Sequence, residues 1–404
     1  MKPPNEHSLW HDLKQLPGAY WILFSGTLVN RFGHFVMPFL AIYLKREGYD
    51  GWVTGAALAA YGAGGLIANL AGGYLADRIG RKPTIVTSCG TASMAMIALC
   101  FASGPTWIIA ASGAVGLTSA MYFPAASALL ADLVPKPLRI RAFGCQRLAI
   151  NLGFALGMIT AGMLATRSFT LLFFIDAATT TLLGLLVLFG LPRGVRRVPK
   201  NAGWPTALKA MKANPAYIRA VIASFCIAAV FWQVSSSWGL HVTQGLGLSP
   251  ATYGWLMALN GLMIVLFELP LTSFTRKHPE VRAMVIGYAL VGIGMGLNLL
   301  GGGLTGAAIV VVVFTLGEMI ALPVAHSYIA SIAPEDMRGR FMGVLGVAWS
   351  AATMLGPAAG IALFEYSPDL LWVACLGLGL GAAWCVARTR KASAPVAVPS
   401  AIEG

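Results

Sequence analysis

Charged residues are scarce in this sequence. Asp, Glu, Lys and Arg make up 11% of its 404 residues, whereas 57% of the residues are hydrophobic. An average soluble domain carries roughly 25% charged residues. A soluble protein with so little charge could not cover its own surface. The composition therefore excludes a cytosolic enzyme, a disordered protein and a secreted disulfide scaffold, and it indicates a polytopic membrane protein.

Several short signatures are also missing. The six cysteines lie in apolar stretches and form no CxxC pair, so we expect neither a disulfide framework nor a metal site. The chain has no GxxxxGK[ST] sequence for ATP binding and no HExxH, GxSxG or paired-acid hydrolase pattern. Its first residues, MKPPNEHSLWHDLKQLPGAY, lack the apolar core and cleavage site of a signal peptide. We therefore predict no catalytic residue, no cofactor and no ATP-driven step, so the protein is not expected to be an enzyme.

Twelve apolar stretches are long enough to cross a bilayer, which takes about 20 residues in a helix. They leave short loops and one longer central connection. The predicted spans are 19–44, 52–75, 84–103, 106–132, 142–166, 169–191, 217–240, 252–274, 282–301, 305–332, 341–364 and 369–387.

Lys and Arg lie almost entirely in alternate loops. With these spans, 23 of the 28 basic residues fall on one side of the membrane and three on the other. Cytoplasmic loops carry an excess of Lys and Arg. The pattern thus predicts that both termini and the central connection are cytoplasmic. It also makes the net charge of +13 a signal of topology, so we expect no nucleic-acid partner.

The second half of the chain echoes the first at a constant offset of 199 residues. The stretch VPKPLRIRAFG aligns without a gap with APEDMRGRFMG, and Gly, Pro and Arg positions elsewhere recur at the same offset. Such a repeat indicates two six-helix halves of the same orientation. Parallel halves of this kind are typical of transporters that rock around a central cavity.

The loop after the second span reads GGYLADRIGRKP. It closely resembles the loop signature of the major facilitator superfamily, and the span count, central loop and repeat extend the resemblance to the whole chain. The matching residues are Gly73, Asp77, Arg78, Gly80, Arg81 and Lys82. Gly73 allows two helices to approach closely, and Gly80 permits a tight turn in the loop. The resemblance implies that Asp77 contacts the start of helix 11 and that Arg81 pairs with Asp132, which together close the cytoplasmic side. The alternative is that these are solvated loop charges.

A second, narrower resemblance lies in helix 10. The pair Gly317-Glu318, followed by Pro323, is similar to helix 10 of drug:proton antiporters of the MdtH and LmrP kind. In LmrP-like members an acid at this place takes part in proton coupling, so the resemblance implies that role for Glu318. The Gly-Pro pair that such antiporters carry in helix 5 is found here in helix 11, as Gly356-Pro357.

Ionisable residues at membrane depth are costly and are usually functional. Glu318 is the first candidate for proton coupling and Glu268 the second; the alternative for each is a fixed partner, which for Glu268 would be a basic residue of the same half. Arg31 is a candidate counter-charge or anchor for an anionic substrate. Asp176 is expected to stabilise the start of its own helix. Arg147 could reach the cytoplasmic interface.

Polar and aromatic side chains suggest a substrate cavity. The candidates besides Arg31 are Asn30, His34, Tyr122, Trp232, Gln233, Trp238 and His326. Aromatic cavity walls suit a bulky amphipathic substrate. The alternative for each aromatic is a position that faces lipid or lies at the membrane interface.

These observations predict an all-α integral membrane protein of the major facilitator fold, with twelve transmembrane helices in two pseudo-symmetric halves and both termini cytoplasmic. The predicted parts are an N-terminal segment (1–18), a first half (19–191), a linker (192–216), a second half (217–388) and a disordered tail (389–404). The preferred function is proton-coupled efflux of small hydrophobic or amphipathic compounds across the inner membrane of a bacterial cell, driven by the proton gradient. The alternative is a dedicated carrier of one metabolite, anionic solute or lipid. The expected partners are substrate, protons and lipid, and the family resemblance implies a monomer.

Overall fold

The computed structural model describes residues 15–135, 138–191, 204–275, 277–334 and 337–389. These residues are nearly all helical, because a backbone in hydrocarbon must satisfy its own N–H and C=O groups. Among them, ten helices are long and apolar enough to cross a membrane. Two further predicted spans, the first and the seventh, are helices interrupted near their middle.

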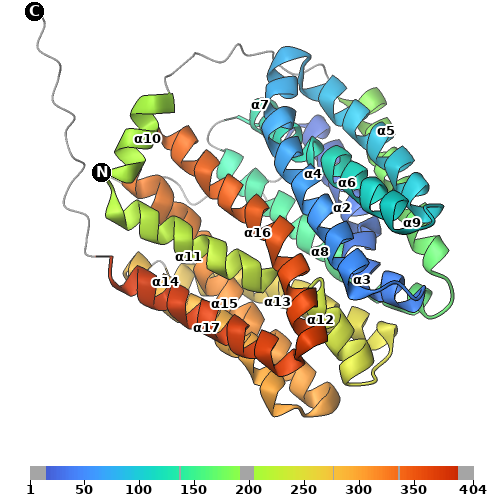
Figure 1. The fold of residues 1–404 in the computed structure, drawn as a ribbon. Helices are drawn as coiled ribbons and strands as arrows, with labels where there is room; N and C mark the ends of the chain where they lie inside the picture. Colours follow the sequence, from blue (N-terminus) through green and yellow to red (C-terminus); the bar gives the residue numbers. More distant parts are fainter. Residues whose placement is uncertain (1–14, 136–137, 192–203, 276, 335–336, 390–404) are drawn as a thin grey trace, which may run out of the picture.

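The first half holds eight helical segments, drawn from blue through cyan to green in Figure 1. They are α2 (Gly18–Gly33), α3 (Val36–Arg46), α4 (Gly51–Arg78), α5 (Arg81–Cys100), α6 (Pro105–Ala120), α7 (Tyr122–Leu133), α8 (Arg139–Ala165) and α9 (Phe169–Gly190). The predicted spans agree with these segments to within a few residues. Two spans are divided, however, because the chain breaks at His34 and turns at Met121.

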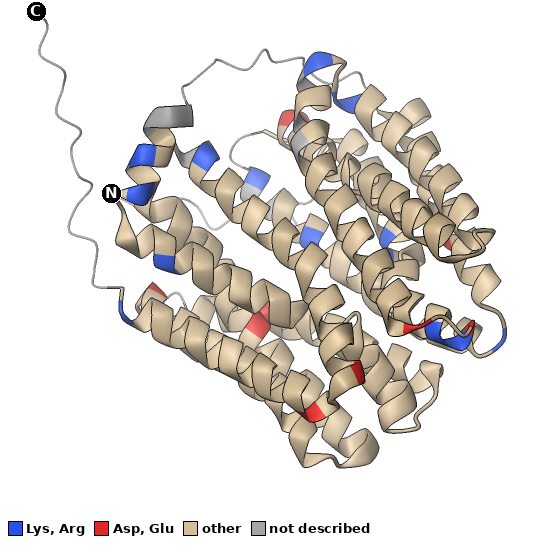
Figure 2. Ribbon diagram, viewed as in Figure 1, with Lys and Arg blue, Asp and Glu red and all other residues tan. Residues whose placement is uncertain are grey.

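The second half follows a short helix in the linker, α10 (Trp204–Lys212). Its segments are α11 (Pro215–Phe231), α12 (Ser237–Leu240), the π-helical turn η2 (His241–Gly245), α13 (Pro250–Thr275), α14 (Glu280–Gly296), the 3₁₀ turn η3 (Leu297–Leu300), α15 (Gly303–Ile332), α16 (Arg338–Tyr366) and α17 (Pro368–Ala387). We call the end of the bundle that carries α10 the linker end, and the opposite end, with residues 46–50 and 366–367, the distal end. Figure 2 shows basic residues gathered at the linker end, on α10 and near the start of α5.

The two interruptions are held by buried polar contacts. At the first, the backbone N–H of Val36 lies 3.5 Å from Oδ2 of Asp176, on α9. At the second, residues 232–236 separate α11 from α12, and the Gln233 side chain donates a hydrogen bond of 2.8 Å to the carbonyl of Gly356. A Cβ at Gly360 would lie 1.8 Å from Oε1 of Gln233. The glycines beside Pro357 therefore make room for a side chain that ties helix 7 to helix 11.

The halves meet along two helix pairs, α4 with α16 and α8 with α13, and α3 also contacts α12. At the distal end Lys45 of α3 forms an ion pair with Glu365 of α16. Nearby, the Tyr253 hydroxyl donates a 3.3 Å hydrogen bond to the carbonyl of Pro38. Contacts between the halves thus close the distal end of the bundle.

Glycine allows α4 and α16 to come this close. A Cβ at Gly62 would lie 2.5 Å from both the backbone N and the Cα of Met354. We expect Gly62→Ala to force the two helices apart and to cost about 1–3 kcal/mol of stability, as overpacking of a filled core does. The matched control is Gly65→Ala on the same helix, where the nearest atom is Ala120 Cβ at 3.9 Å. The melting temperatures of the purified variants test this; equal values would contradict the close contact.

Candidate functional site

An acid lies buried in the middle of α15. Glu318 is 7% exposed. Asn260, on α13, donates a hydrogen bond of 3.0 Å to its Oε2 and a second, of 2.9 Å, to the hydroxyl of Thr315. Within the part of the chain that the structure describes, no Lys or Arg lies within 4 Å of this carboxyl. Glu318 thus accepts a hydrogen bond from one neutral donor, the Asn260 amide, and has no direct counter-ion among the described residues.

A second acid joins the two halves. Oε1 of Glu268, on α13, lies 2.5 Å from Nη2 of Arg147, on α8. The alternative considered for Glu268 was a basic partner within its own half. The partner found here belongs to the other half, because α13 packs along α8. Arg147 is therefore used in an ion pair between the halves. Arg147 and Glu268 are also the charged groups that act on Glu318 over longer range.

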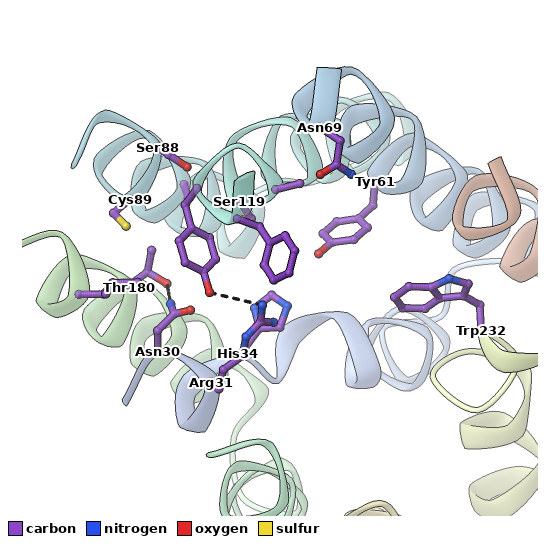
Figure 3. A pocket seen from close by; sticks show the side chains of 15 residues that line it. Asn30, Arg31, His34, Tyr61, Asn69, Ser88, Cys89, Ser119, Thr180 and Trp232 are labelled. Atoms are coloured by element: carbon purple, nitrogen blue, oxygen red, sulfur yellow. Dashed lines mark hydrogen bonds between the residues drawn. The ribbon is translucent and has the colours of Figure 1, made fainter. Parts of the chain in front are cut away.

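A cavity of about 260 Å³ lies in the first half, among α2, α4, α5, α6, α7 and α9. Figure 3 shows Arg31, His34 and Tyr61 turned toward the same space, with Trp232 entering from the second half. Nη2 of Arg31 lies 3.4 Å from the hydroxyl of Tyr122. The wall therefore combines a guanidinium with aromatic rings, a combination that can hold a small amphipathic molecule.

Five of the eight candidate cavity residues line this cavity: Asn30, Arg31, His34, Tyr122 and Trp232. The amide of Asn30 donates a hydrogen bond of 2.9 Å to Thr180 on α9.

The other three candidates are elsewhere. Trp238 is packed in the core and its indole N–H donates a 3.0 Å hydrogen bond to Asn298. Gln233 holds the break in helix 7, as described above. His326 is exposed, and its Nδ1 lies 2.9 Å from the carbonyl of Leu322. Trp238 and Gln233 are thus buried and hydrogen-bonded, His326 is exposed, and none of the three lines this cavity.

The buried acid of α9 does something different from what we expected. Asp176 was predicted to stabilise the start of its own helix, but α9 begins seven residues earlier, at Phe169. Its carboxylate instead faces the first turn of α3 and the hydroxyl of Thr180, each at 3.5 Å. It still meets the positive end of a helix dipole, but the helix is the second part of the interrupted first span.

The loop between α4 and α5 makes one of the two contacts that the sequence led us to expect. Nε of Arg81, a buried residue, lies 2.7 Å from Oδ2 of Asp132 at the end of α7. Gly80 has a φ of +104°, a conformation that glycine adopts readily. The predicted Arg81–Asp132 pair is present.

The rest of the loop signature is less informative. Lys82 donates a 2.6 Å hydrogen bond to the carbonyl of Leu191. Arg78 is exposed and lies near the ring of Tyr74, on its own helix. The surroundings of Gly73 and the side chain of Asp77 lie outside the described part of the chain. The contact of Asp77 with helix 11 therefore stays a prediction.

The sequence analysis missed Asn260, Tyr61 and Asn69. Asn260 supports Glu318, and the other two line the cavity. Each is a polar residue within an apolar span, so a search for neutral polar residues at membrane depth would have found them. Among the described residues, no group of three or more His, Cys, Asp or Glu side chains lies close enough to hold a metal ion.

Comparison with known proteins decides the family. The model of the Major Facilitator Superfamily matches residues 23–246 and 220–403, which together span most of the chain. The chain belongs to this superfamily. It is therefore a multi-pass membrane transporter and not an enzyme.

Individual relatives in the superfamily are distant. The chain is 25% identical over 364 residues to the multidrug resistance protein MdtH of Aeromonas hydrophila, covering 87% of this chain and 90% of that protein. It is 25% identical over 357 residues to a Na(+), Li(+), K(+)/H(+) antiporter of Planococcus maritimus, covering 80% of this chain and 84% of that protein. The crystal structure of a peptide transporter, POT, in complex with sulfate has a TM-score of 0.76 over 95% of this chain and 97% of that one, at 19% identity. This last likeness shows the fold alone.

Proposed function

We propose that this transporter exports small amphipathic compounds in exchange for protons, by alternating access across a bacterial cytoplasmic membrane. In this proposal twelve spans form two halves, the linker end faces the cytoplasm, and one chain is the working unit. The observation that carries the proposal is Glu318, a carboxyl buried in a membrane helix that has no direct counter-ion within the described part of the chain.

The chemistry follows from the cost of burial. An ionised carboxylate in a low-dielectric interior is unfavourable unless a positive charge compensates it. Binding of a proton neutralises the carboxylate and so removes this cost. Glu318 would therefore take up a proton when its site faces the acidic side and release it when water reaches the site from the other side. Proton binding would accompany substrate release outside, and proton loss would accompany substrate uptake inside.

Two further findings support this proposal. One relative is named a multidrug resistance protein and another an antiporter that exchanges cations for protons. In addition, the Arg81–Asp132 pair fixes the α4–α5 loop against the end of α7. We propose that this loop, with Asp77, closes the linker end when the halves rock, whereas the Lys45–Glu365 pair closes the distal end in the form seen here.

The test is accumulation of several structurally unrelated dyes and drugs in an efflux-deficient bacterial host that expresses the chain. We expect accumulation to fall relative to cells with the empty vector, and a protonophore should abolish the difference, because it collapses the gradient. Lower accumulation that persists with the protonophore would contradict proton coupling. No change for any compound would favour the alternative, a dedicated carrier of one metabolite, anionic solute or lipid.

A further inference from the structure

The cavity in the first half has a charge that the proposed function does not use. Arg31 contributes a guanidinium to its wall, and no Asp or Glu is among the described residues that line it. Nε of Arg31 is buried and has no hydrogen-bond partner among the residues that the structure describes. Its contact with the Tyr122 hydroxyl, at 3.4 Å, is long for a hydrogen bond.

No described acid neutralises this guanidinium by direct contact. Within the described residues no carboxylate lies within 4 Å of Arg31. Asp176 acts on it only over longer range, since its oxygens face the N–H of Val36 and the hydroxyl of Thr180. An uncompensated charge at membrane depth is costly. A ligand that carries a negative charge would remove much of that cost.

A second unsatisfied donor faces the same space. The indole Nε1 of Trp232 is buried, and no described residue accepts a hydrogen bond from it. Trp232 reaches the cavity from the second half. Buried donors are nearly always paired in native structures, and each exception calls for an explanation. Two such donors at one cavity, Arg31 and Trp232, point to an acceptor that is supplied by a ligand.

We infer that this cavity binds an amphipathic organic anion, with the oxygens of its acid group taken up by the Arg31 guanidinium and the indole N–H of Trp232, and its apolar part against Tyr61 and Phe123. The inference rests on the proposed function, because it names the class of compound that is carried. A guanidinium presents parallel N–H groups that match the two oxygens of a carboxylate, sulfonate or phosphate. The same charge repels lipophilic cations. A ligand of this kind would also connect the halves, because Trp232 belongs to the second.

The test uses three probes of nearly the same shape: 2-naphthoate, its neutral amide 2-naphthamide, and the cation 2-naphthylmethylammonium. Binding to the purified transporter is measured by calorimetry and by the rise in melting temperature, since a ligand stabilises the state that it binds. We expect 2-naphthoate to bind most tightly and the cation to bind most weakly. Equal or tighter binding of the cation would overturn the inference.

Substitutions at Arg31, compared with one at Arg167, locate the anion. Loss of a hydrogen bond to a charged group weakens binding by about tenfold to a hundredfold, so we expect a loss of this size for 2-naphthoate in Arg31→Gln, with little change for the amide. Arg167→Gln, which removes the same charge from an exposed loop, should bind as the unchanged protein does. Arg31→Lys should recover part of the affinity. If Arg31→Gln does not fold, Trp232→Phe serves in its place, with an expected several-fold loss that would contradict the inference if absent.

A competition experiment distinguishes a lipid headgroup from a soluble acid as the source of the anion. Displacement of 2-naphthoate by phosphatidylglycerol but not by phosphatidylcholine would assign the acid group to a lipid, and no displacement by either would assign it to a soluble acid. These binding measurements need no gradient. Selective anion binding without gradient-driven export would therefore contradict the proposed function alone, whereas protonophore-sensitive export with preferred cation binding would contradict this inference alone.

Discussion

Replacing Glu318 with glutamine should abolish substrate movement driven by a pH gradient in proteoliposomes, to the level of protein-free vesicles. Glutamine has nearly the same shape as a protonated glutamate but cannot lose a proton. Its carbonyl can accept the hydrogen bond that Asn260 now donates to Oε2, so the variant should fold and keep the packing of α13 against α15. The coupling step would be lost while the fold is preserved.

The same variant should retain two other properties. Glu318 does not line the cavity of the first half, so substrate binding should change little. Exchange of labelled for unlabelled substrate without a gradient should also continue, because a permanently neutral side chain still allows the carrier to rock. The control is Glu47→Gln, the same chemical change at an exposed position near the distal end. Gradient-driven transport by Glu318→Gln at the unchanged rate would show that another group carries the proton.

Much of the architecture could be predicted because it depends on local properties. Span length, hydropathy and the position of basic residues are each read from a short window of sequence. The Arg81–Asp132 pair could also be anticipated, since the loop signature of the family fixes the relation between α5 and α7. The breaks at His34 and at residues 232–236 could not be predicted, because each depends on a distant partner. For these breaks the partners are Asp176 and the carbonyl of Gly356.

The candidate site, like the fold, could be predicted from the sequence only in part. Sequence alone identified Arg31 and Glu318 as charges at membrane depth, since only a few such residues occur within the spans. It could not assign partners, because pairing depends on which helices of the two halves pack together. Trp238 and Trp232 illustrate the difficulty, as they lie six residues apart on the same span, on either side of its break. One bonds to Asn298 in the core and the other faces the cavity.

The Arg147–Glu268 pair should behave as an energetic link between the halves. Removing one partner leaves the other as an uncompensated charge, which costs about 3–5 kcal/mol when a pair is fully buried. Glu268 is buried but the Arg147 side chain is 44% exposed, so we expect a smaller loss, roughly 1–2 kcal/mol, in either Glu268→Gln or Arg147→Gln. The double variant should be more stable than the sum of the two losses predicts, because it leaves neither charge unpaired.

A double-mutant cycle measures this link directly. The melting temperatures of the four proteins give the coupling, and gradient-driven transport by the same four shows whether the pair also takes part in rocking. If the pair only holds α8 against α13, the double variant should regain both stability and transport. If Glu268 also relays protons to Glu318, on which it acts over longer range, the double variant should regain stability and remain inactive. Additive losses in stability would show that the 2.5 Å contact does not join the halves energetically.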